Sequence, residues 1–234
     1  MRTFIIHVSN AYAREKHMQE QVKGKDLEVT YILDGDIKDV SDKVISKYFK
    51  GRMASASKDS SCVYKHLLAL ESVVKENCDF ALILEDDISF YPGFNERMKE
   101  IMAEAKTKQL KNFILSIEDS NLKYVAKSEL TPGQIIYPKK KGRLAGAFIV
   151  DKAGAQSMLD YAQKVKVELP MDWYHNLCVE KGLVNMYWSK YSMAVQGSLD
   201  GTIASTLDDK KSGNFRVLSF KMQRVYKKLL YSFR

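Results

Sequence analysis

Three consecutive carboxylates follow an apolar run in the first half of the chain. The run Phe80–Leu84 is typical of a strand buried on both faces, and Glu85, Asp86 and Asp87 come directly after it. Three negative charges at the end of a buried strand repel one another unless a cation or hydrogen-bond donors offset them. Divalent cations with oxygen ligands supply that charge and also bridge diphosphates. The pattern therefore indicates a site for a metal and a phosphate or, as the alternative, an acidic surface turn.

A second apolar run also ends in acids, because Phe113–Ile117 leads directly into Glu118 and Asp119. Ligands of open α/β sheets bind beyond the carboxyl ends of the strands. Acids from two neighbouring strands therefore favour one site at a shared edge of the sheet. One set of acids would hold a metal and phosphate pair, and another would provide a separate general base.

A third acid, Asp172, stands in the first turn of a helix that Pro170 opens. An acid at that place is ordinary helix-dipole chemistry, and in the functional alternative it faces the crevice. There it would be flanked by Trp173 and Tyr174, on which a sugar ring could stack. Arg14 follows the first strand, where it could reach a phosphate or stay in solvent. The chain has no glycine-rich phosphate loop and no nucleophile elbow, so the commonest nucleotide-binding and hydrolase patterns lose support.

The elements that must position these acids alternate between strands and helices. We expect strands at residues 3–8, 27–33, 80–84, 113–117, 144–150 and 184–188. We expect helices at residues 10–22, from Ser60 or Ser61 to about 74, 94–108, 152–164 and 170–179. This alternation predicts an α/β fold around a mostly parallel sheet with helices on both faces. Residues 121–141, with two prolines and three consecutive lysines, are expected to form an irregular excursion over the sheet.

The charge of the chain is concentrated at its C-terminal end. The 234 residues include 37 Lys and Arg against 29 Asp and Glu, a net charge of +8. Residues 210–234 contain eight basic residues and no acidic one, so this segment accounts for the whole excess. We therefore expect a neutral catalytic domain over residues 1–209 and a basic tail over residues 210–234, with no nucleic-acid partner. The three cysteines have no disulfide or zinc-finger spacing, which favours a reducing compartment.

The tail has the pattern of an amphipathic helix. Its apolar residues recur every three or four positions and are Phe215, Leu218, Met222, Val225, Leu229 and Phe233. Its basic residues fall mostly on the other side and include Lys221, Arg224, Lys227 and Lys228. This pattern predicts a helix lying on an anionic membrane; the alternative is a helix that docks its apolar stripe on the body. Because the N-terminus lacks a signal-peptide pattern, we expect a cytoplasmic protein, peripheral on the inner face of the membrane.

Five blocks keep the order and spacing of one family's motifs. They are Phe4–Ser9 with Arg14, Cys62–His66, Ile83–Ile88, Ala145–Val150 and Pro170–Asp172. Together they resemble glycosyltransferase family 25, the bacterial lipooligosaccharide galactosyltransferase type, over nearly the whole chain. In the second block, Cys62 and His66 match the family, whereas Lys65 stands where Ser is usual and Ser61 where Gly is usual.

The resemblance implies a GT-A-like glycosyltransferase that uses a UDP-sugar with Mn²⁺ or Mg²⁺. It implies that Asp87, helped by Asp86, holds the metal, and that Glu85 or Asp86 binds sugar or ribose hydroxyls. It also implies inversion at the anomeric carbon, which needs a carboxylate base. For that base Asp172 is preferred over Glu118. The other residues expected at the nucleotide sugar are Val8, Ser9, Arg14 and His66, and those expected at the acceptor are Trp173 and Tyr174.

The predicted reaction moves a hexose, with galactose expected before glucose or an N-acetylhexosamine, to a lipooligosaccharide or another cell-surface glycan. One alternative is a sugar-nucleotide pyrophosphorylase, which would carry a glycine-rich opening loop that residues 8–14 lack. The other is a catalytically silent glycan- or membrane-binding module. The three acids at positions 85–87 argue against it, because a silent module has no need of them.

Overall fold

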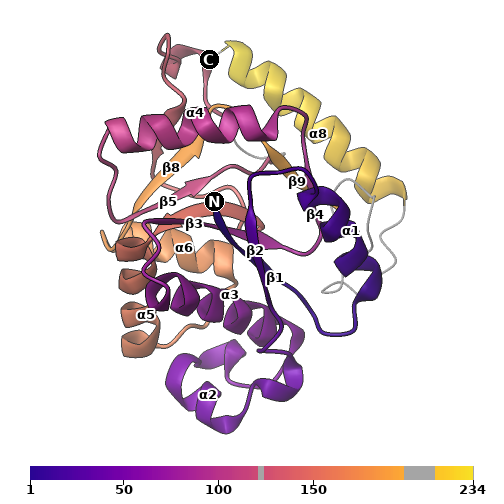
Figure 1. Ribbon diagram of the computed structural model, residues 1–234, viewed down its shortest axis with the longest axis vertical. Helices are drawn as coiled ribbons and strands as arrows, with labels where there is room; N and C mark the ends of the chain where they lie inside the picture. The colour runs from indigo at the N-terminus through magenta and orange to yellow at the C-terminus, as the bar shows by residue number, and fades with distance from the viewer. Residues whose placement is uncertain (121–123, 198–213, 234) are drawn as a thin grey trace.

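A seven-stranded mixed sheet forms the centre of the molecule (Figure 1). The computed structural model describes residues 1–120, 124–197 and 214–233. In spatial order the strands are β2 (Glu28–Ile32), β1 (Arg2–Ile6), β3 (Phe80–Glu85), β7 (Ala147–Asp151), β5 (Phe113–Ser116), β8 (Asn185–Ser189) and β6 (Ile136–Lys139). A separate two-stranded sheet pairs β4 (Ile88–Phe90) with β9 (Ala194–Gln196).

Most strands of the large sheet run in one direction. Strands β2, β1 and β3 are parallel, as are β5 and β8, whereas β7 is antiparallel to both β3 and β5, and β6 to β8. The predicted α/β fold with a mostly parallel sheet is therefore confirmed. Because β7 runs the opposite way, its first residues lie between the last residues of β3 and β5, which is where the sequence places the acids.

Helices cover both faces of the sheet (Figure 1). The α-helices in the described part of the chain are α1 (Tyr12–Val22), α2 (Asp42–Tyr48), α3 (Lys58–Lys75), α4 (Phe94–Thr107), α5 (Lys152–Val165), α6 (Met171–Glu180) and α8 (Asn214–Phe233). Successive side chains of a strand point to opposite faces. Along β3, Ala81 and Ile83 therefore join the core beneath α3 and α5, whereas Leu82 and Leu84 join the core beneath α1 and α4.

The N-cap of helix α3 is Ser57, which precedes both expected caps, Ser60 and Ser61. The Ser57 hydroxyl accepts a hydrogen bond from Ser60 N at 3.2 Å, and Ser60 Oγ accepts one from Ser57 N at 2.9 Å. This reciprocal arrangement is a capping box, with a serine in the place usually taken by Glu or Gln. Ser60 and Ser61 are therefore inside the helix, and Ser61 Oγ instead donates to the Gly35 carbonyl at 2.7 Å.

The expected excursion over residues 121–141 is in part regular. Its residues Ile136–Lys139 form β6, which pairs with β8 at the edge of the sheet. An edge strand tolerates Pro138, because the missing N–H of proline disrupts pairing only inside a sheet. The residues 121–123 lie outside the described part of the chain.

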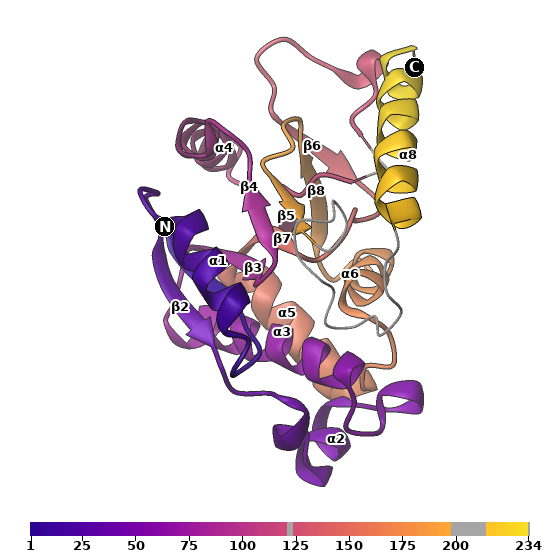
Figure 2. The same ribbon diagram turned by 90° about the vertical axis from the view of Figure 1, so that its right-hand side faces the viewer.

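The C-terminal helix α8 lies alongside the body (Figure 2), where it contacts a 3-10 turn at Lys127–Glu129. The expected boundary after residue 209 falls within 198–213, and so lies outside the described residues, as do Lys210 and Lys211. Among the helices that the structure describes, none is both long enough and apolar enough to span a membrane.

Candidate active site

The acids predicted to share one edge of the sheet are held there by the start of β7. Glu118, just after β5, is completely buried, and its Oε2 accepts hydrogen bonds from Gly146 N at 2.8 Å and Ala147 N at 3.2 Å. Glu85, at the end of β3, accepts a hydrogen bond from Gln196 Nε2 at 2.8 Å. A Cβ on Gly146 would lie 2.5 Å from that same Nε2. Glycine at this position therefore lets three strands meet around the acids.

Glu118 has an unusually high affinity for a proton. Burial raises the pKa of its carboxyl group well above the ordinary value, and the charges of Glu85 and Asp87 raise it further. The two backbone N–H groups of β7 act in the opposite direction. Its second oxygen, Oε1, has no hydrogen-bond partner among the described residues. This acidic cluster (Glu85, Asp87 and Glu118) therefore favours binding of a proton or of a cation.

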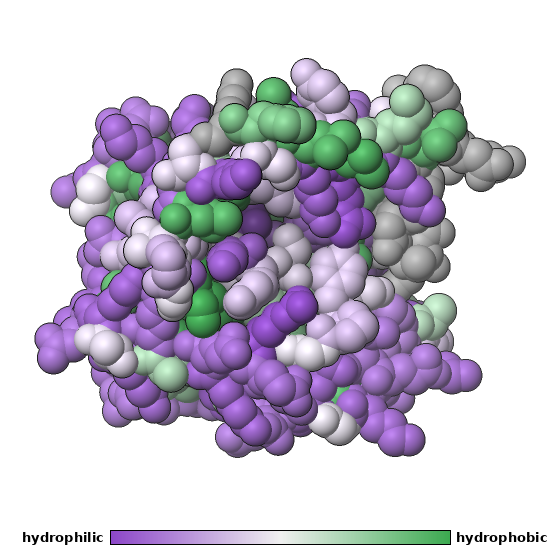
Figure 3. Space-filling view, turned by 90° about the horizontal axis from the view of Figure 1, so that it is seen from above, coloured by the Kyte–Doolittle hydropathy of each residue, from purple (hydrophilic) through white to green (hydrophobic). Residues whose placement is uncertain are grey.

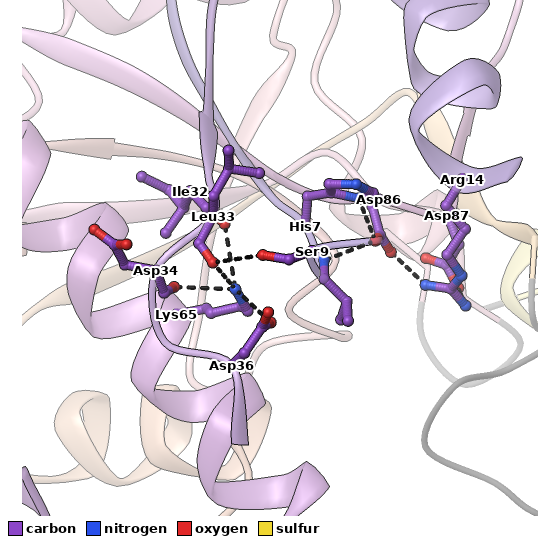
Figure 4. Close-up of polar contacts among 11 residues, drawn as sticks. His7, Ser9, Arg14, Ile32, Leu33, Asp34, Asp36, Lys65, Asp86 and Asp87 are labelled. Carbon is purple, nitrogen blue, oxygen red and sulfur yellow. Dashed lines mark hydrogen bonds and ion pairs between the residues drawn. The ribbon is translucent and has the colours of Figure 1, made fainter. Parts of the chain in front are cut away.

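Asp86 belongs to a different set of contacts from the acidic cluster (Figure 4). Its carboxylate accepts a hydrogen bond from His7 Nδ1 at 2.8 Å, a longer one from Val8 N at 3.4 Å, and pairs with Arg14. Burial acts to raise the pKa of Asp86, but the hydrogen bond from His7 and the charge of Arg14 lower it below its usual value. The Arg14 guanidinium also lies 3.6 Å from Asp87 Oδ2, so it connects Asp86 with the acidic cluster.

The loop after β2 is held by a buried lysine. Lys65 is 1% exposed, and its Nζ donates to the carbonyl oxygens of Leu33 at 2.8 Å and Asp34 at 3.0 Å. The same ammonium group lies 3.0 Å from Asp36 Oδ1, and Ser9 Oγ donates to Leu33 O at 3.3 Å (Figure 4). The lysine that replaces the usual serine therefore fixes this loop beside Ser9.

His66 and Asp172 lie next to the acidic cluster. His66 Nε2 is 3.2 Å from Glu85 Oε1. Burial raises the pKa of Asp172, and the N–H of Trp173, 2.9 Å from Asp172 Oδ1, opposes this effect. The charges of Glu85 and His66 also act on Asp172, and α6 contacts α3, the helix that carries His66.

Among the described residues, one group of three side chains at this edge has its ligand atoms close enough together to hold a metal ion. The ligand atoms of Cys62, His66 and Glu85 lie within 4.8 Å of one another. Burial raises the pKa of the Cys62 thiol well above its ordinary value, so the thiolate form that binds metals is disfavoured. Carboxylate oxygens suit Mg²⁺ and Mn²⁺ better than a mixed sulfur and nitrogen set. The carboxylates of the acidic cluster suit such an ion by their chemistry, but within the described part of the chain their oxygens do not form a group as close as that of Cys62, His66 and Glu85.

The two aromatic residues expected at the acceptor have different environments. Trp173 is 62% exposed, in the first turn of α6. Tyr174 is buried, and its hydroxyl donates to the Met158 carbonyl oxygen at 2.6 Å. Tyr174 is therefore a core residue that packs α6 on α5, and it has no surface on which a sugar could stack.

A buried arginine behind the acids was not found from the sequence. Arg143 donates from its guanidinium to the Ser116 carbonyl oxygen at 2.8 Å. Burial lowers its pKa to about 10, although the charges of Asp119 and Glu118 act to raise it. Arg143 therefore supplies a positive charge close to Glu118. It stands in the loop before β7, where no motif points to it.

Asp119 attaches the C-terminal helix to the body. Its carboxylate accepts a hydrogen bond from Tyr91 OH at 2.8 Å and one from Ser192 Oγ at 3.1 Å, and it forms an ion pair with Arg224 at 2.6 Å. Phe220 of the same helix is buried. Arg224, expected to face a membrane, thus faces the body instead.

The predicted apolar stripe of α8 points away from the body. Five of its residues are exposed, namely Leu218, Met222, Val225, Leu229 and Phe233. Figure 3 shows a green strip of apolar side chains along this helix at the edge of the molecule. The side chains of Phe215 and Arg216 and all of Arg234 lie outside the described residues. The alternative in which the stripe docks on the body is therefore not what the structure has.

The chain was compared with known proteins. The model of a family described as "Glycosyltransferase family 25 (LPS biosynthesis protein)" matches residues 1–174. None of the curated proteins matches the chain. Similar solved structures include galactosyltransferase LgtC with donor and acceptor sugar analogues (12% identity, 80% of this chain and 73% of that one, TM-score 0.42). A second is the apo form of a UDP-glucose pyrophosphorylase (9% identity, 97% of this chain and 82% of that one, TM-score 0.41). A third is mouse xyloside xylosyltransferase 1 in its apo form (11% identity, 78% of this chain and 70% of that one, TM-score 0.35). The range matched by the family includes β1, β3, β5, β7 and the start of α6.

Proposed function

The chain belongs to glycosyltransferase family 25, and on this basis we propose that it transfers a hexose from a UDP-sugar to a hydroxyl group of a lipooligosaccharide or another surface glycan. Galactose is the first candidate for the sugar. The observation that carries the proposal is the convergence of the acidic cluster, Arg14 and Asp172 at one edge of the sheet. The pyrophosphorylase alternative is dropped, because the family match over residues 1–174 identifies a glycosyltransferase.

We assign the metal ion, Mn²⁺ or Mg²⁺, to Asp87. The resemblance implies a helping role for Asp86, but both oxygens of Asp86 already interact with His7 and Arg14. The charges of Glu85 and Asp87 both act on Glu118, so the three carboxylates share one electrostatic environment. When bound, such an ion offsets the negative charge that develops on the departing diphosphate. Arg14, which bridges Asp86 and Asp87, adds a fixed positive charge from the chain itself.

The nucleotide is assigned to the surface formed by the ends of β1 and β2. Val8 is exposed at that place, and Ser9 and Lys65 fix the loop that contains Asp34 and Asp36. Backbone groups and carboxylates of this loop suit the hydroxyls and polar edges of a nucleoside. His66, hydrogen-bonded to Glu85, is assigned to the sugar end of the same ligand.

Asp172 is the preferred base for the inverting transfer. It removes the proton of the acceptor hydroxyl as that oxygen attacks the anomeric carbon and the UDP group leaves from the opposite face. Burial raises the pKa of Asp172, which makes its carboxylate a stronger base than an exposed aspartate. Glu118 is completely buried and held by Gly146 N and Ala147 N, so it has no access to an acceptor. The exposed Trp173 offers a stacking surface for the acceptor sugar.

The apolar face of α8 is assigned to an anionic membrane. The exposed stripe has Lys221 close by on the helix, and basic side chains beside an apolar face favour anionic lipids. Lys228, also predicted for this face, lies over the Tyr124 ring of the body and contributes less. Lys227 is half-buried and contributes less, and Arg224 is left out because it pairs with Asp119. A membrane surface suits an enzyme whose acceptor is lipid-linked. We assign the enzyme to the inner, cytoplasmic face.

The first test is the thermal stability of wild type and Asp87→Ala with UDP-galactose, UDP-glucose and UDP-N-acetylglucosamine, each with and without Mn²⁺. A ligand far above its dissociation constant stabilises a fold by about 3 kcal/mol at a hundredfold excess. We expect one UDP-sugar to raise the melting temperature only with Mn²⁺, and the substitution to abolish the effect. If no UDP-sugar stabilises wild type while the chain still binds vesicles, the silent membrane-binding module is correct instead.

A further inference from the structure

A cavity of about 500 Å³ lies between α8 and the body, apart from the acidic cluster. Four basic side chains line it, those of Arg97 on α4, Lys190 before β9, and Arg224 and Lys228 on α8. Three tyrosines complete most of the wall. Nothing in the proposed transfer of the hexose uses this cavity.

The cavity has an excess of positive charge. Arg224 pairs with Asp119, but Arg97, Lys190 and Lys228 form no ion pair with a carboxylate among the described residues. These three cations lie instead over tyrosine rings, at 5.1 Å for Arg97 and 5.7 Å for Lys190 from Tyr191, and at 5.6 Å for Lys228 from Tyr124. Cations held close together on aromatic rings repel one another until an anion lies between them.

Asp119 links the wall of the cavity to the chain segment that carries Glu118 of the acidic cluster. The side chains of Glu118 and Asp119, consecutive in the chain, point in different directions. Glu118 accepts hydrogen bonds from the start of β7, and Asp119 interacts with Tyr91 and Arg224 in the cavity wall. The segment Glu118–Asp119 thus contributes one side chain to the acidic cluster and one to the contacts of the cavity wall. Its other side is formed by α8, the helix whose apolar face is exposed.

We propose that this cavity binds an oxyanion, a phosphate or carboxylate group, carried by the acceptor glycan. The inference rests on the proposed function, because it assigns a site for the acceptor beside the transfer site. Guanidinium groups bind such oxyanions with two parallel hydrogen bonds, and lysines add charge. A group held here is close to both the acids and the helix assigned to the membrane, as a lipid-linked acceptor requires.

The site is tested by titrating the full chain with inorganic phosphate, with EDTA and without nucleotide, and following amide chemical shifts. The test variant is the double substitution Arg97→Gln and Lys190→Gln. Its matched control is Lys99→Gln and Lys164→Gln, which removes the same charge from exposed positions, one of them also on α4. We expect saturable phosphate binding in wild type and the control, and about tenfold weaker binding in the test variant. No saturable binding in wild type, or equal binding in both double variants, overturns the proposal.

Activity measurements separate this proposal from the proposed function. Hydrolysis of the UDP-sugar without acceptor should be the same in wild type and in the test variant, since neither Arg97 nor Lys190 is assigned to the transfer. If wild type itself does not hydrolyse the UDP-sugar, the proposed function is contradicted. The phosphate titration still tests whether the cavity binds an oxyanion. With a phosphorylated acceptor, the KM for acceptor should rise about tenfold in the test variant and kcat should stay unchanged.

The other possible source of the oxyanion is a phospholipid headgroup. It is distinguished by sedimentation with phosphatidylcholine vesicles that contain phosphatidylglycerol. Equal sedimentation of the test variant and its charge-matched control supports the acceptor. A test variant that sediments less than the control, and whose KM for the acceptor is unchanged, overturns the acceptor assignment in favour of the lipid.

Discussion

The carboxyl group of Glu118 is buried at the sheet edge with two N–H groups on one oxygen and no hydrogen-bond partner, among the described residues, for the other. Burial and the charges of Glu85 and Asp87 raise its pKa, so the folded protein holds this proton more tightly than the unfolded chain does. Stability from this group is present at low pH and is lost as pH rises above its unfolded pKa of about 4.5. The same affinity makes the site receptive to a cation.

Glu118→Gln is therefore expected to raise the free energy of unfolding at neutral and higher pH. The amide keeps an oxygen for Gly146 N and Ala147 N but cannot lose a proton. Urea unfolding between pH 4 and pH 9, without metal, should show a gap between variant and wild type that widens as pH rises. The exposed Glu180 provides the control, since Glu180→Gln should leave the curve unchanged. Parallel curves for Glu118→Gln and wild type would contradict the assignment.

Asp172→Asn tests the assignment of the base. Removal of a general base typically slows a reaction by about 10²–10⁴-fold. We expect a loss of kcat in that range with the thermal shift by UDP-sugar retained, because Asp172 is assigned to the acceptor. The low-pH limb of kcat/KM in wild type should lie above the ordinary pKa of aspartate, as burial predicts. A kcat within threefold of wild type for Asp172→Asn would remove it from the mechanism.

At this scale the sequence predicts which acids meet, but not what each one contacts. Glu85 and Glu118 each follow a local apolar run that predicts a buried strand. The carboxyl ends of such strands form the ligand-binding edge of an open α/β sheet, so the place of both acids can be predicted from local sequence. The ion pair of Asp86 with Arg14 joins residues 72 positions apart, and no local pattern reports such a contact. Lys65 is hidden for the same reason, because its acceptors are carbonyl groups of a distant loop.

At the scale of elements, the antiparallel strand β7 decides how close the acids come. Gly146, just before the strand, and Ala147, its first residue, supply N–H groups to Glu118. Gly146 also leaves room for Gln196, which binds Glu85. Alternation of strands and helices indicates a mostly parallel sheet but does not say which strand is reversed. The short strands β4, β6 and β9 were not predicted either, because segments of three or four residues have too few positions to show a period.

Gly146→Ala should disturb this arrangement, because the added Cβ would lie 2.5 Å from Gln196 Nε2. Forced overpacking costs about 1–3 kcal/mol, and we expect a lower melting temperature together with weaker binding of the UDP-sugar. In Gly142→Ala the added Cβ meets the flexible end of Met186 at 3.2 Å, so the loss should be smaller. Adding Gln196→Ala to Gly146→Ala should recover part of the stability. A double variant less stable than the sum of both single changes would argue against the contact.

The contact of α6 with β7 makes a second pH-dependent prediction. His175 packs edge-on against Phe148 with the ring centroids 4.8 Å apart, and burial lowers its pKa to about 3. Between that value and the unfolded pKa of 6.5 the unfolded chain binds more protons, so stability falls as pH falls through this window. His175→Leu removes the group. Its melting temperature should therefore decline less than that of wild type between pH 7 and pH 4, and an equal decline would contradict the assignment.

At the scale of the whole molecule, the C-terminal helix gives the body an apolar edge. The spacing of the tail residues predicts an apolar face on a helix, and the structure has that face exposed. Spacing alone does not determine which face meets the body. Asp119, in the segment after β5, pairs with Arg224, and Phe220 is buried. The face of α8 that carries these two residues therefore contacts the body. An exposed apolar strip beside a cationic cavity is a surface that a lipid-linked, anionic acceptor fits.

Met222→Ser with Leu229→Ser tests whether the strip binds a membrane. Both side chains are exposed, so the free energy of unfolding should change little. Each buried CH₂ contributes about 0.8 kcal/mol to partitioning, and the loss of both side chains should weaken binding to phosphatidylglycerol vesicles at least about tenfold. The control is Leu33→Ser with Ile37→Ser, which removes two exposed apolar residues from the segment after β2. Salt should weaken the binding of wild type, because the lysines near the strip are screened. Equal vesicle binding by the two double variants would mean that α8 has another partner, and the acceptor would then have to reach the acids from solution.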